Sequence, residues 1–341
     1  MKMSLSSARG KAIAAAATLL AAAGLWWCLD ATVARGPSGP PLALTLALPT
    51  ELSGGALFVA QDQRLFADKG ITVTAQPFLL GKMALESVLQ GRADMAIVAD
   101  TPFMLSVMRG NRIATVASVF ASRKTMAVLA RRSSGIATPA DIKGKTIGTV
   151  VGTNAQYFLH ALMVAHGIQR DQVTIVDYAP DALAAALRSG RIDGATMWHP
   201  DIGRMQRELG VAVAPVFAED VFAYRFLLVG TTDYIDANGP AISRLLAGLD
   251  AGADFIHARP AQARQIVGKA IGLDPLLLAG AFDPGDYQLA LDQSLLLALD
   301  DQTRWAVRQG IIAPAAVPNY LDMVRTKPLQ AVRPNAIRII N

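Results

Sequence analysis

The hydrophobic positions of residues 42–122 fall into short β-rich runs that alternate with segments of helical period. The spacing predicts strands over 42–48, 71–78, 93–99 and 113–120, and helices over 55–70, 82–92 and 101–110. Connections between these elements are short. This alternation is typical of a parallel sheet covered by helices.

A second unit repeats this rhythm from residue 123 onward. Strands are expected over 125–132, 146–152, 172–178 and 194–198, with helices over 154–167, 180–190 and 200–209. After one more strand, at 222–230, the remainder reads as a helical tail. We therefore expect an α/β protein of two Rossmann-like lobes with a central cleft: lobe I is formed by 42–122 with 226–335, and lobe II by 123–225.

The first residues have the pattern of an export signal. Lys2, Arg9 and Lys11 precede an uncharged apolar stretch over Ala12–Leu29. A basic segment followed by an apolar one is typical of secretory signals, and this stretch is also near the lower length limit for a membrane span. Residues 1–34 are interpreted as a signal peptide or a signal anchor, two alternatives that remain open.

A Pro- and Gly-containing linker follows the export segment at 35–41. Cys28 is the only cysteine of the chain, so neither an internal disulfide nor a multi-cysteine metal site is possible. Lipidation of Cys28 is a weaker alternative than a cysteine within an apolar helix, because bulky residues precede it.

Composition narrows the function classes. Only 17% of the 341 residues are charged, the net charge is +5, and basic residues form no long run, which argues against nucleic-acid binding. The four histidines have no metal-ligand spacing, and the sequence contains no hydrolase, metalloprotease or nucleotide-binding motif. No catalytic residue, metal or cofactor is therefore expected.

Candidate binding residues lie where predicted strands end. Ligands of open parallel sheets bind beyond the carboxyl ends of the strands. The residues that follow several predicted strands are polar, aromatic or glycine, and we expect them to bind ligand: Thr50, Glu51, Ser53, Asp100, Thr101, Gly152, Thr153, Asn154, Trp198 and His199.

The stretch Gly152–Asn154 heads a predicted helix. A helix N-terminus presents unpaired N–H groups and a partial positive charge, which suits an anionic oxygen of a sulfonate, carboxylate, nitrate or phosphate. The alternative is that Thr153 or Asn154 serves only as the N-cap.

The other candidates also have two interpretations each. Trp198 and His199 are either core residues or one wall of a ligand pocket. Glu51 is either a surface carboxylate or, if it faces the cleft, a group that rejects simple anions or pairs with a ligand amine. Tyr157 fits the core and a pocket lining equally well.

Taken together, the motifs resemble the periplasmic substrate-binding proteins of the nitrate/sulfonate/taurine transporter family. The resemblance spans about residues 44–325, and it depends on the order and spacing of several segments: 46–74, 84–104, 134–159, 187–205 and 308–323. It implies a type II periplasmic-binding fold, and ligand contacts from Thr50 to Ser53, Asp100 and Thr101, Gly152–Asn154, and Trp198 with His199.

The resemblance also implies a function. The expected protein is a monomeric periplasmic component that delivers a small anionic or zwitterionic solute to an inner-membrane ABC permease. Glu51 departs from the neutral donors that an anion site prefers. A membrane-tethered sensor or adaptor is the first alternative. An enzyme of the thiamine-pyrimidine synthase type is less favoured, since it would need a cysteine-rich motif.

Overall fold

The computed structural model describes residues 42–274, 278 and 280–340. The predicted export segment, the linker and Cys28 therefore lie outside the described residues. In the described part of the chain, no helix combines the length and the apolar character that a membrane span requires.

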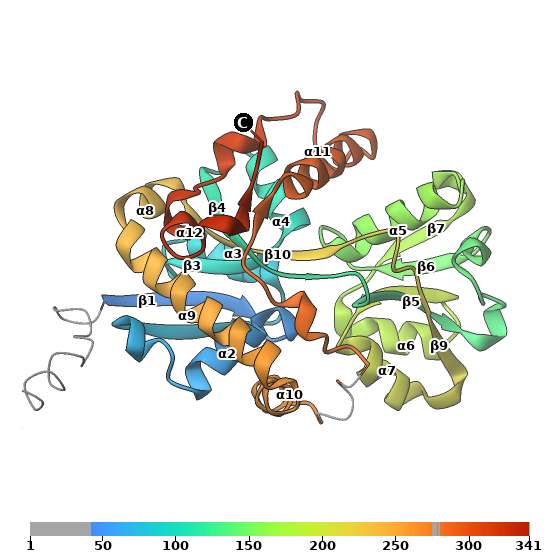
Figure 1. Ribbon diagram of the computed structural model, residues 1–341. Coiled ribbons are helices and arrows are strands. Elements are labelled where there is room, and N and C mark those ends of the chain that lie inside the picture. Colours follow the sequence, from blue (N-terminus) through green and yellow to red (C-terminus); the bar gives the residue numbers. More distant parts are fainter. Residues whose placement is uncertain (1–41, 275–277, 279, 341) are drawn as a thin grey trace, which may run out of the picture. The chain divides into compact units, whose positions relative to one another are not determined.

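One five-stranded sheet, on the left in Figure 1, combines four strands from the beginning of the described chain with β10 from its later part. Its strands lie in the order β2-β1-β3-β10-β4, with these bounds: β1 Leu42–Pro49, β2 Ile71–Phe78, β3 Met95–Ala99, β4 Ile113–Ser122 and β10 Tyr224–Thr231. Every residue of β3 is buried, as expected for a strand covered on both faces.

A second five-stranded sheet has the order β7-β6-β8-β5-β9. Its strands are β5 Met126–Arg131, β6 Thr146–Thr149, β7 Thr174–Asp177, β8 Gly194–Trp198 and β9 Val213–Phe217. The sequence pattern does not indicate β9, whose run contains Pro215. A short two-stranded ladder joins β11 (Leu291–Asp292) to β12 (Ile337–Arg338).

Both sheets are mixed, whereas the alternation of elements predicted parallel ones. β10 runs antiparallel to β3 and β4, and β5 runs antiparallel to β8 and β9. The reason is where the chain changes sheets. It leaves β4 at Ser122 and enters β5 at Met126, which pairs with Trp198 at the carboxyl end of β8. A strand that starts at the carboxyl edge has to run antiparallel to its neighbours.

The return crossing follows the same geometry. β9 ends at Phe217, and β10 begins at Tyr224, which pairs with Ser122 at the carboxyl end of β4. The carboxyl edges of both sheets therefore lie at the two crossings.

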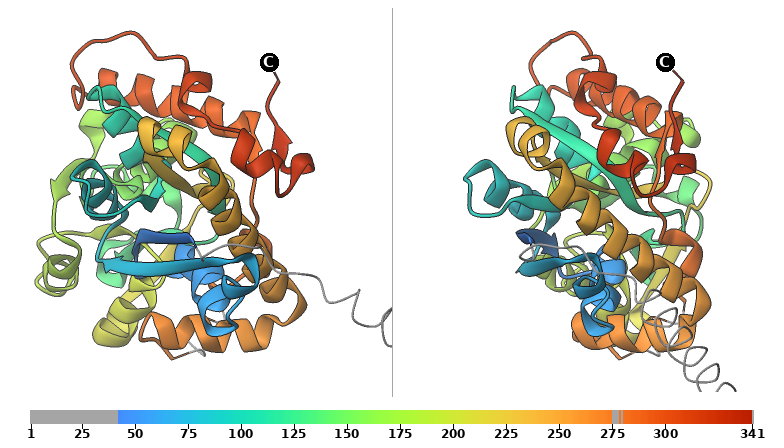
Figure 2. Two further views of the ribbon diagram at one scale, coloured as in Figure 1. Left: turned by 90° about the vertical axis from the view of Figure 1, so that its left-hand side faces the viewer. Right: turned by 60° about the vertical axis from the view of Figure 1, so that its left-hand side comes forward.

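Helices cover the first sheet and continue into the helical tail expected from the sequence (Figures 1 and 2). α3 packs on β3, α4 contacts β10, α2 packs against α9 and α10, and α11 returns over α4. Their bounds are α2 Gly55–Asp62, α3 Gly81–Leu89, α4 Asp100–Met108, α8 Thr232–Ala237, α9 Gly239–Ala258, α10 Pro260–Ala270, α11 Gln293–Arg308 and α12 Lys327–Gln330.

α2 is shorter than the helix predicted over 55–70. It ends at Asp62, and Arg64 has the left-handed φ of 57°, which breaks the helical hydrogen-bond pattern. α2 also lies unusually near α9. A Cβ on Gly252 of α9 would lie 2.2 Å from the backbone oxygen of Ala56, so only glycine allows this approach.

The second sheet carries three named helices among the described residues: α5 Asn154–Ala165, α6 Leu183–Arg188 and α7 Asp201–Leu209. α5 follows β6 and α7 follows β8, as the sequence predicted. Gly167, just after α5, has a positive φ of 64°, as is common for a glycine that terminates a helix.

Candidate ligand-binding site

A small cavity lies where the carboxyl edges of the two sheets meet. It is lined by Glu51, Leu80, Gly81, Lys82, Ala99, Pro102, Thr153, Asn154, Trp198, Tyr224 and Phe226. Both sheets contribute, since Glu51 follows β1 and Trp198 ends β8. Its volume is about 20 Å³, close to the space that one water molecule needs.

Three amide groups around the start of α5 donate to side chains within the protein. Ala155 N donates to the Thr153 hydroxyl at 3.2 Å, and Gly152 N donates to Gln156 Oε1 at 2.9 Å. Val151 N donates to the Asp177 carboxylate at 3.0 Å. Thr153 therefore acts as the N-cap, the alternative that the sequence left open, although it also lines the cavity.

Asn154 connects the two sheets through a buried hydrogen bond. Its side-chain Nδ2 donates to Asp100 Oδ1 at 2.6 Å, and the two residues are 1% and 0% exposed. Burial raises the pKa of Asp100, while nearby Arg225, Asn154 and Gln302 oppose that rise. The other amide atom of Asn154, Oδ1, and the second oxygen of Asp100 have no hydrogen-bond partner among the described residues.

Glu51 is the titratable group of the opposite wall. The residue is 8% exposed, and Tyr224 donates its phenolic hydrogen to Glu51 Oε2 at 3.3 Å. Burial, reinforced by the negative charge of Asp201, raises the pKa of Glu51 to about 8. At neutral pH this carboxyl group is therefore largely protonated.

Aromatic rings frame the same wall. Tyr224 and Phe226 pack edge to face with their centroids 4.9 Å apart, and Trp198 is 5% exposed beside them. Trp198 thus combines both roles considered from the sequence, because it is nearly buried and it lines the cavity.

Lys82 supplies a positive charge that the sequence analysis overlooked. It lies in the first turn of α3, and its Nζ donates to the backbone oxygen of Val151, across to the second sheet, at 3.4 Å. Applying the strand-end rule to the strand over 71–78 would have pointed to Leu80–Lys82. Tyr224 and Phe226 carried no such signal, because they begin an antiparallel strand.

The structure does not bring every predicted residue into the cavity lining. Those absent from it are Thr50, Ser53, Asp100, Thr101, Gly152 and His199. Asp100 and Thr101 are fully buried at the start of α4, and Thr50 is exposed. The predicted roles of these residues in binding stay predictions.

His199 and Tyr157 have different surroundings from the cavity. The His199 ring stacks on Phe217 with a centroid separation of 6.1 Å, and burial lowers its pKa to about 4. Tyr157 packs edge to face on Trp305 at 5.1 Å and on Phe222 at 5.5 Å. Tyr157 therefore belongs to the packing between α5 and α11.

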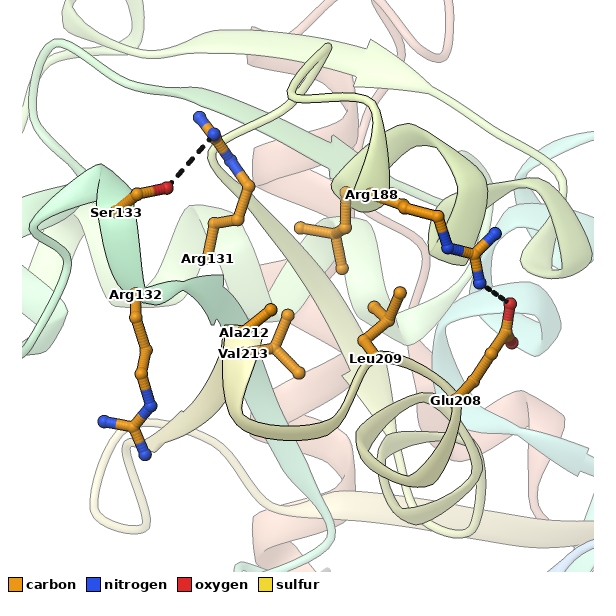
Figure 3. A pocket seen from close by; sticks show the side chains of 9 residues that line it. Arg131, Arg132, Ser133, Arg188, Glu208, Leu209, Ala212 and Val213 are labelled. Carbon is orange, nitrogen blue, oxygen red and sulfur yellow. Dashed lines mark hydrogen bonds and ion pairs between the residues drawn. The ribbon is translucent and has the colours of Figure 1, made fainter.

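A larger hollow of about 450 Å³ lies at the other edge of the second sheet (Figure 3). Arg131, the last residue of β5, lines this hollow. Because β5 pairs antiparallel with β8 and Met126 is the partner of Trp198, Arg131 lies at the end of the sheet away from Trp198. Arg188 is paired with Glu208 there, and Arg131 with Asp193. This hollow contains none of the residues predicted to bind ligand.

The described residues contain no group of three or more His, Cys, Asp or Glu side chains arranged to hold a metal ion. The chemistry available at the cavity is thus that of hydrogen bonds, aromatic faces, one ammonium group and one buried carboxyl group.

Comparison with known proteins identifies the family of the chain. A family model described as NMT1/THI5 like matches residues 54–263. The chain belongs to this family. Among its relatives, a Brucella abortus (strain 2308) protein provisionally named as a binding protein is 24% identical over 219 residues, which is 63% of this chain and 67% of the relative. The taurine-binding periplasmic protein of Escherichia coli (strain K12) is 27% identical over 169 residues, 49% of this chain and 52% of that one.

Solved structures of other proteins share the fold. The periplasmic aliphatic sulphonate binding protein SsuA from Escherichia coli matches with a TM-score of 0.73 and 17% identity, over 86% of this chain and 99% of that one. The desulfurization enzyme DSZB matches with a TM-score of 0.65 and 15% identity, over 86% and 99%. These matches confirm the periplasmic-binding fold expected from the sequence.

Proposed function

We propose that this NMT1/THI5-like protein is the solute-binding component of an ABC importer, and that it captures a small anionic or zwitterionic solute. The observation that carries the proposal is the cavity at the meeting carboxyl edges, with Lys82, Asn154 and Trp198 in its lining. The names of the taurine- and sulphonate-binding relatives support this solute class.

Solute entry requires the walls to separate. A cavity of about 20 Å³ holds about one water molecule, whereas a sulfonate has several heavy atoms. The division into lobe I (42–122 with 226–335) and lobe II (123–225) provides the moving parts, since the chain changes sheets only near Ser122–Met126 and Phe217–Tyr224 among the described residues. Closure then removes water from around the solute and strengthens its polar contacts.

The charged end of the solute is assigned to the wall near Lys82. The ammonium group supplies the positive charge, and the indole of Trp198 supplies a flat face and one N–H donor. We also propose that the protein acts in the periplasm as a monomer, free or anchored to the inner membrane by residues 1–34, and delivers its solute to an inner-membrane permease.

We propose binding rather than catalysis. DSZB shows that enzymes occur on this fold. An enzyme of the thiamine-pyrimidine synthase type would use a cysteine-rich motif, and the only cysteine of this chain is Cys28 in the predicted export segment. A soluble form that starts at residue 35 and turns over a pyrimidine or a sulfinate would overturn this part of the proposal.

The proposal is tested by thermal shift and calorimetry of that soluble form with taurine, alkanesulfonates and nitrate. At least one of them should bind, and Trp198→Ala and Lys82→Gln should each weaken it by about tenfold or more, or about 1.4 kcal/mol. Lys143→Gln, at an exposed site on the second sheet's side, is the matched control and should bind as the unaltered protein does. Absence of binding by every solute, or full affinity in both variants, would overturn the proposal.

A further inference from the structure

The cavity lining contains one buried hydrogen-bond acceptor without a donor and one buried carboxyl group with a single donor. Asn154 Nδ2 is committed to Asp100, so the amide oxygen Oδ1 is left as a buried acceptor with no partner among the described residues. Glu51 presents a carboxyl group that receives one hydrogen bond, from Tyr224 at 3.3 Å. Buried acceptors are costly unless a donor reaches them, so a solute that brings donors is favoured.

No described cation forms an ion pair with Glu51. Lys82 lines the same cavity, but it is exposed and its Nζ contacts the Val151 backbone oxygen. Arg204 is paired with Asp201 at 2.6 Å. Asp201 and the Tyr224 phenol act on Glu51, and neither carries positive charge. Asp100 also acts on Tyr224, and the positive charge of buried Arg225 acts on Asp100.

The aromatic frame suits a cation as well. Trp198, Tyr224 and Phe226 all line the cavity beside Glu51. Aromatic faces attract ammonium groups, most strongly where water is excluded. A carboxyl group, a free amide oxygen and aromatic rings together form the kind of surface that recognises a protonated nitrogen.

We infer that Glu51 and Asn154 Oδ1 bind a protonated nitrogen of the solute, so that the cavity selects amino-substituted solutes over plain anions. The inference deepens the proposed function, because the anionic end of the same solute is assigned to the side of Lys82. The preferred substrate class is then a small zwitterion whose amine and acid groups lie a few bonds apart.

Binding of such a solute displaces a proton. Glu51 is protonated below about pH 8 because of its burial, and an ammonium group binds its carboxylate form. The proton leaves to solvent as the ion pair forms. Below pH 8 the affinity should therefore rise with pH by up to about tenfold per unit. It should level off above pH 8, until the amine of the solute itself loses its proton.

The test compares taurine with isethionate and ethanesulfonate, which replace the amine by a hydroxyl group and by hydrogen. Calorimetry at pH 7 should show taurine binding at least about tenfold more tightly than either analogue. Repeating it in buffers of different ionisation enthalpy should show net proton release with taurine alone. Equal affinity for the three sulfonates would overturn the inference while leaving the proposed function in place.

Substitution of Glu51 tests whether this residue causes the preference for taurine and the proton release. Glu51→Gln should remove the preference for taurine and the proton release, while ethanesulfonate binds at least as well as before. Glu86→Gln, at an exposed position of α3, is the matched control and should keep both. Retained preference in Glu51→Gln would overturn the inference.

Failure of the two proposals can be told apart. If no sulfonate binds but ethanolamine binds and Glu51→Gln abolishes that binding, the solute class of the proposed function is wrong. The inference that Glu51 and Asn154 bind a protonated nitrogen is then retained.

Discussion

Two corners of the molecule occupy equivalent places in their sheets and differ in the polar groups that they present. At the corner after β1, Glu51 lies buried with one hydrogen bond and a pKa of about 8. At the corner after β6, Thr153 caps α5 and the nearby amides donate to side chains of the protein itself.

The difference shows that position at a carboxyl edge does not by itself determine binding chemistry. The α5 corner has the helix N-terminus that suits an anion, yet the amides of Val151, Gly152 and Ala155 already donate to side chains of the protein. The β1 corner also leads into a helix, α2, through the 3-10 turn Leu52–Gly54, but it presents a buried acid that forms no ion pair among the described residues. Which corner recognises which part of a solute depends on the hydrogen bonds left over after folding.

The largest expected effect concerns the acid at the first corner. The folded protein keeps the Glu51 proton up to about pH 8, whereas the unfolded chain loses it near the ordinary value of 4.5. The free energy of unfolding should therefore fall as the pH rises from 4.5 to 8, by about 4 to 5 kcal/mol from this group when no solute is bound. Urea unfolding of the unaltered protein and Glu51→Gln at pH 5, 6.5 and 8 measures that difference.

The control for this pH dependence is Glu86→Gln, which should retain the full slope. Other buried carboxyl groups, such as Asp100 and Asp201, also make the free energy of unfolding depend on pH. The free energies of the variants are therefore compared with one another at each pH. Parallel curves for the unaltered protein and Glu51→Gln would show that Glu51 is ionised and solvated in the folded state.

A smaller effect is expected from the bond that joins the second corner to the first sheet. Asn154→Leu leaves Asp100 buried without its 2.6 Å donor and should lower the free energy of unfolding by about 2 kcal/mol. Asp100→Leu should cost a similar amount, and the double variant less than their sum, with a coupling of about 1 kcal/mol or more. Strictly additive losses in denaturant unfolding would mean that the two side chains do not interact.

The smallest effect concerns the backbone of the second corner. Gly152 has a φ of 75°, and a Cβ there would meet no atom within 4 Å, so the cost of Gly152→Ala is conformational and should be about 1 kcal/mol. Gly203→Ala, within α7 and equally free of contacts, is the matched control and should be neutral or slightly stabilising. Thermal unfolding of the two variants should therefore shift in opposite directions or by clearly different amounts.

The sequence located part of the cavity because a carboxyl edge is a local property. A strand followed by a helix can be recognised within about twenty residues, and this rule found Glu51, Thr153, Asn154 and Trp198. The same rule, applied without knowledge of packing, also included Thr50 and His199, whose side chains lie elsewhere.

The rest of the cavity depends on contacts between distant segments. Tyr224 and Phe226 reach it because β10 is inserted antiparallel between β3 and β4, and no local pattern states that pairing. The predicted anion site at α5 depended on whether its donors were free. Asp177, Gln156 and Asp100 accept from Val151 N, Gly152 N and Asn154 Nδ2, and two of these three acceptors are far from the corner in sequence.

The close approach of Gly252 to the Ala56 backbone has a mechanical consequence. α2 follows directly on the segment that carries Glu51, and its backbone packs against α9 too closely to admit a Cβ at residue 252. The acid-bearing corner thus rests on a stiff support. We therefore expect the proposed lobe II, residues 123–225, to move when solutes of different length bind, while the position of the acid stays fixed.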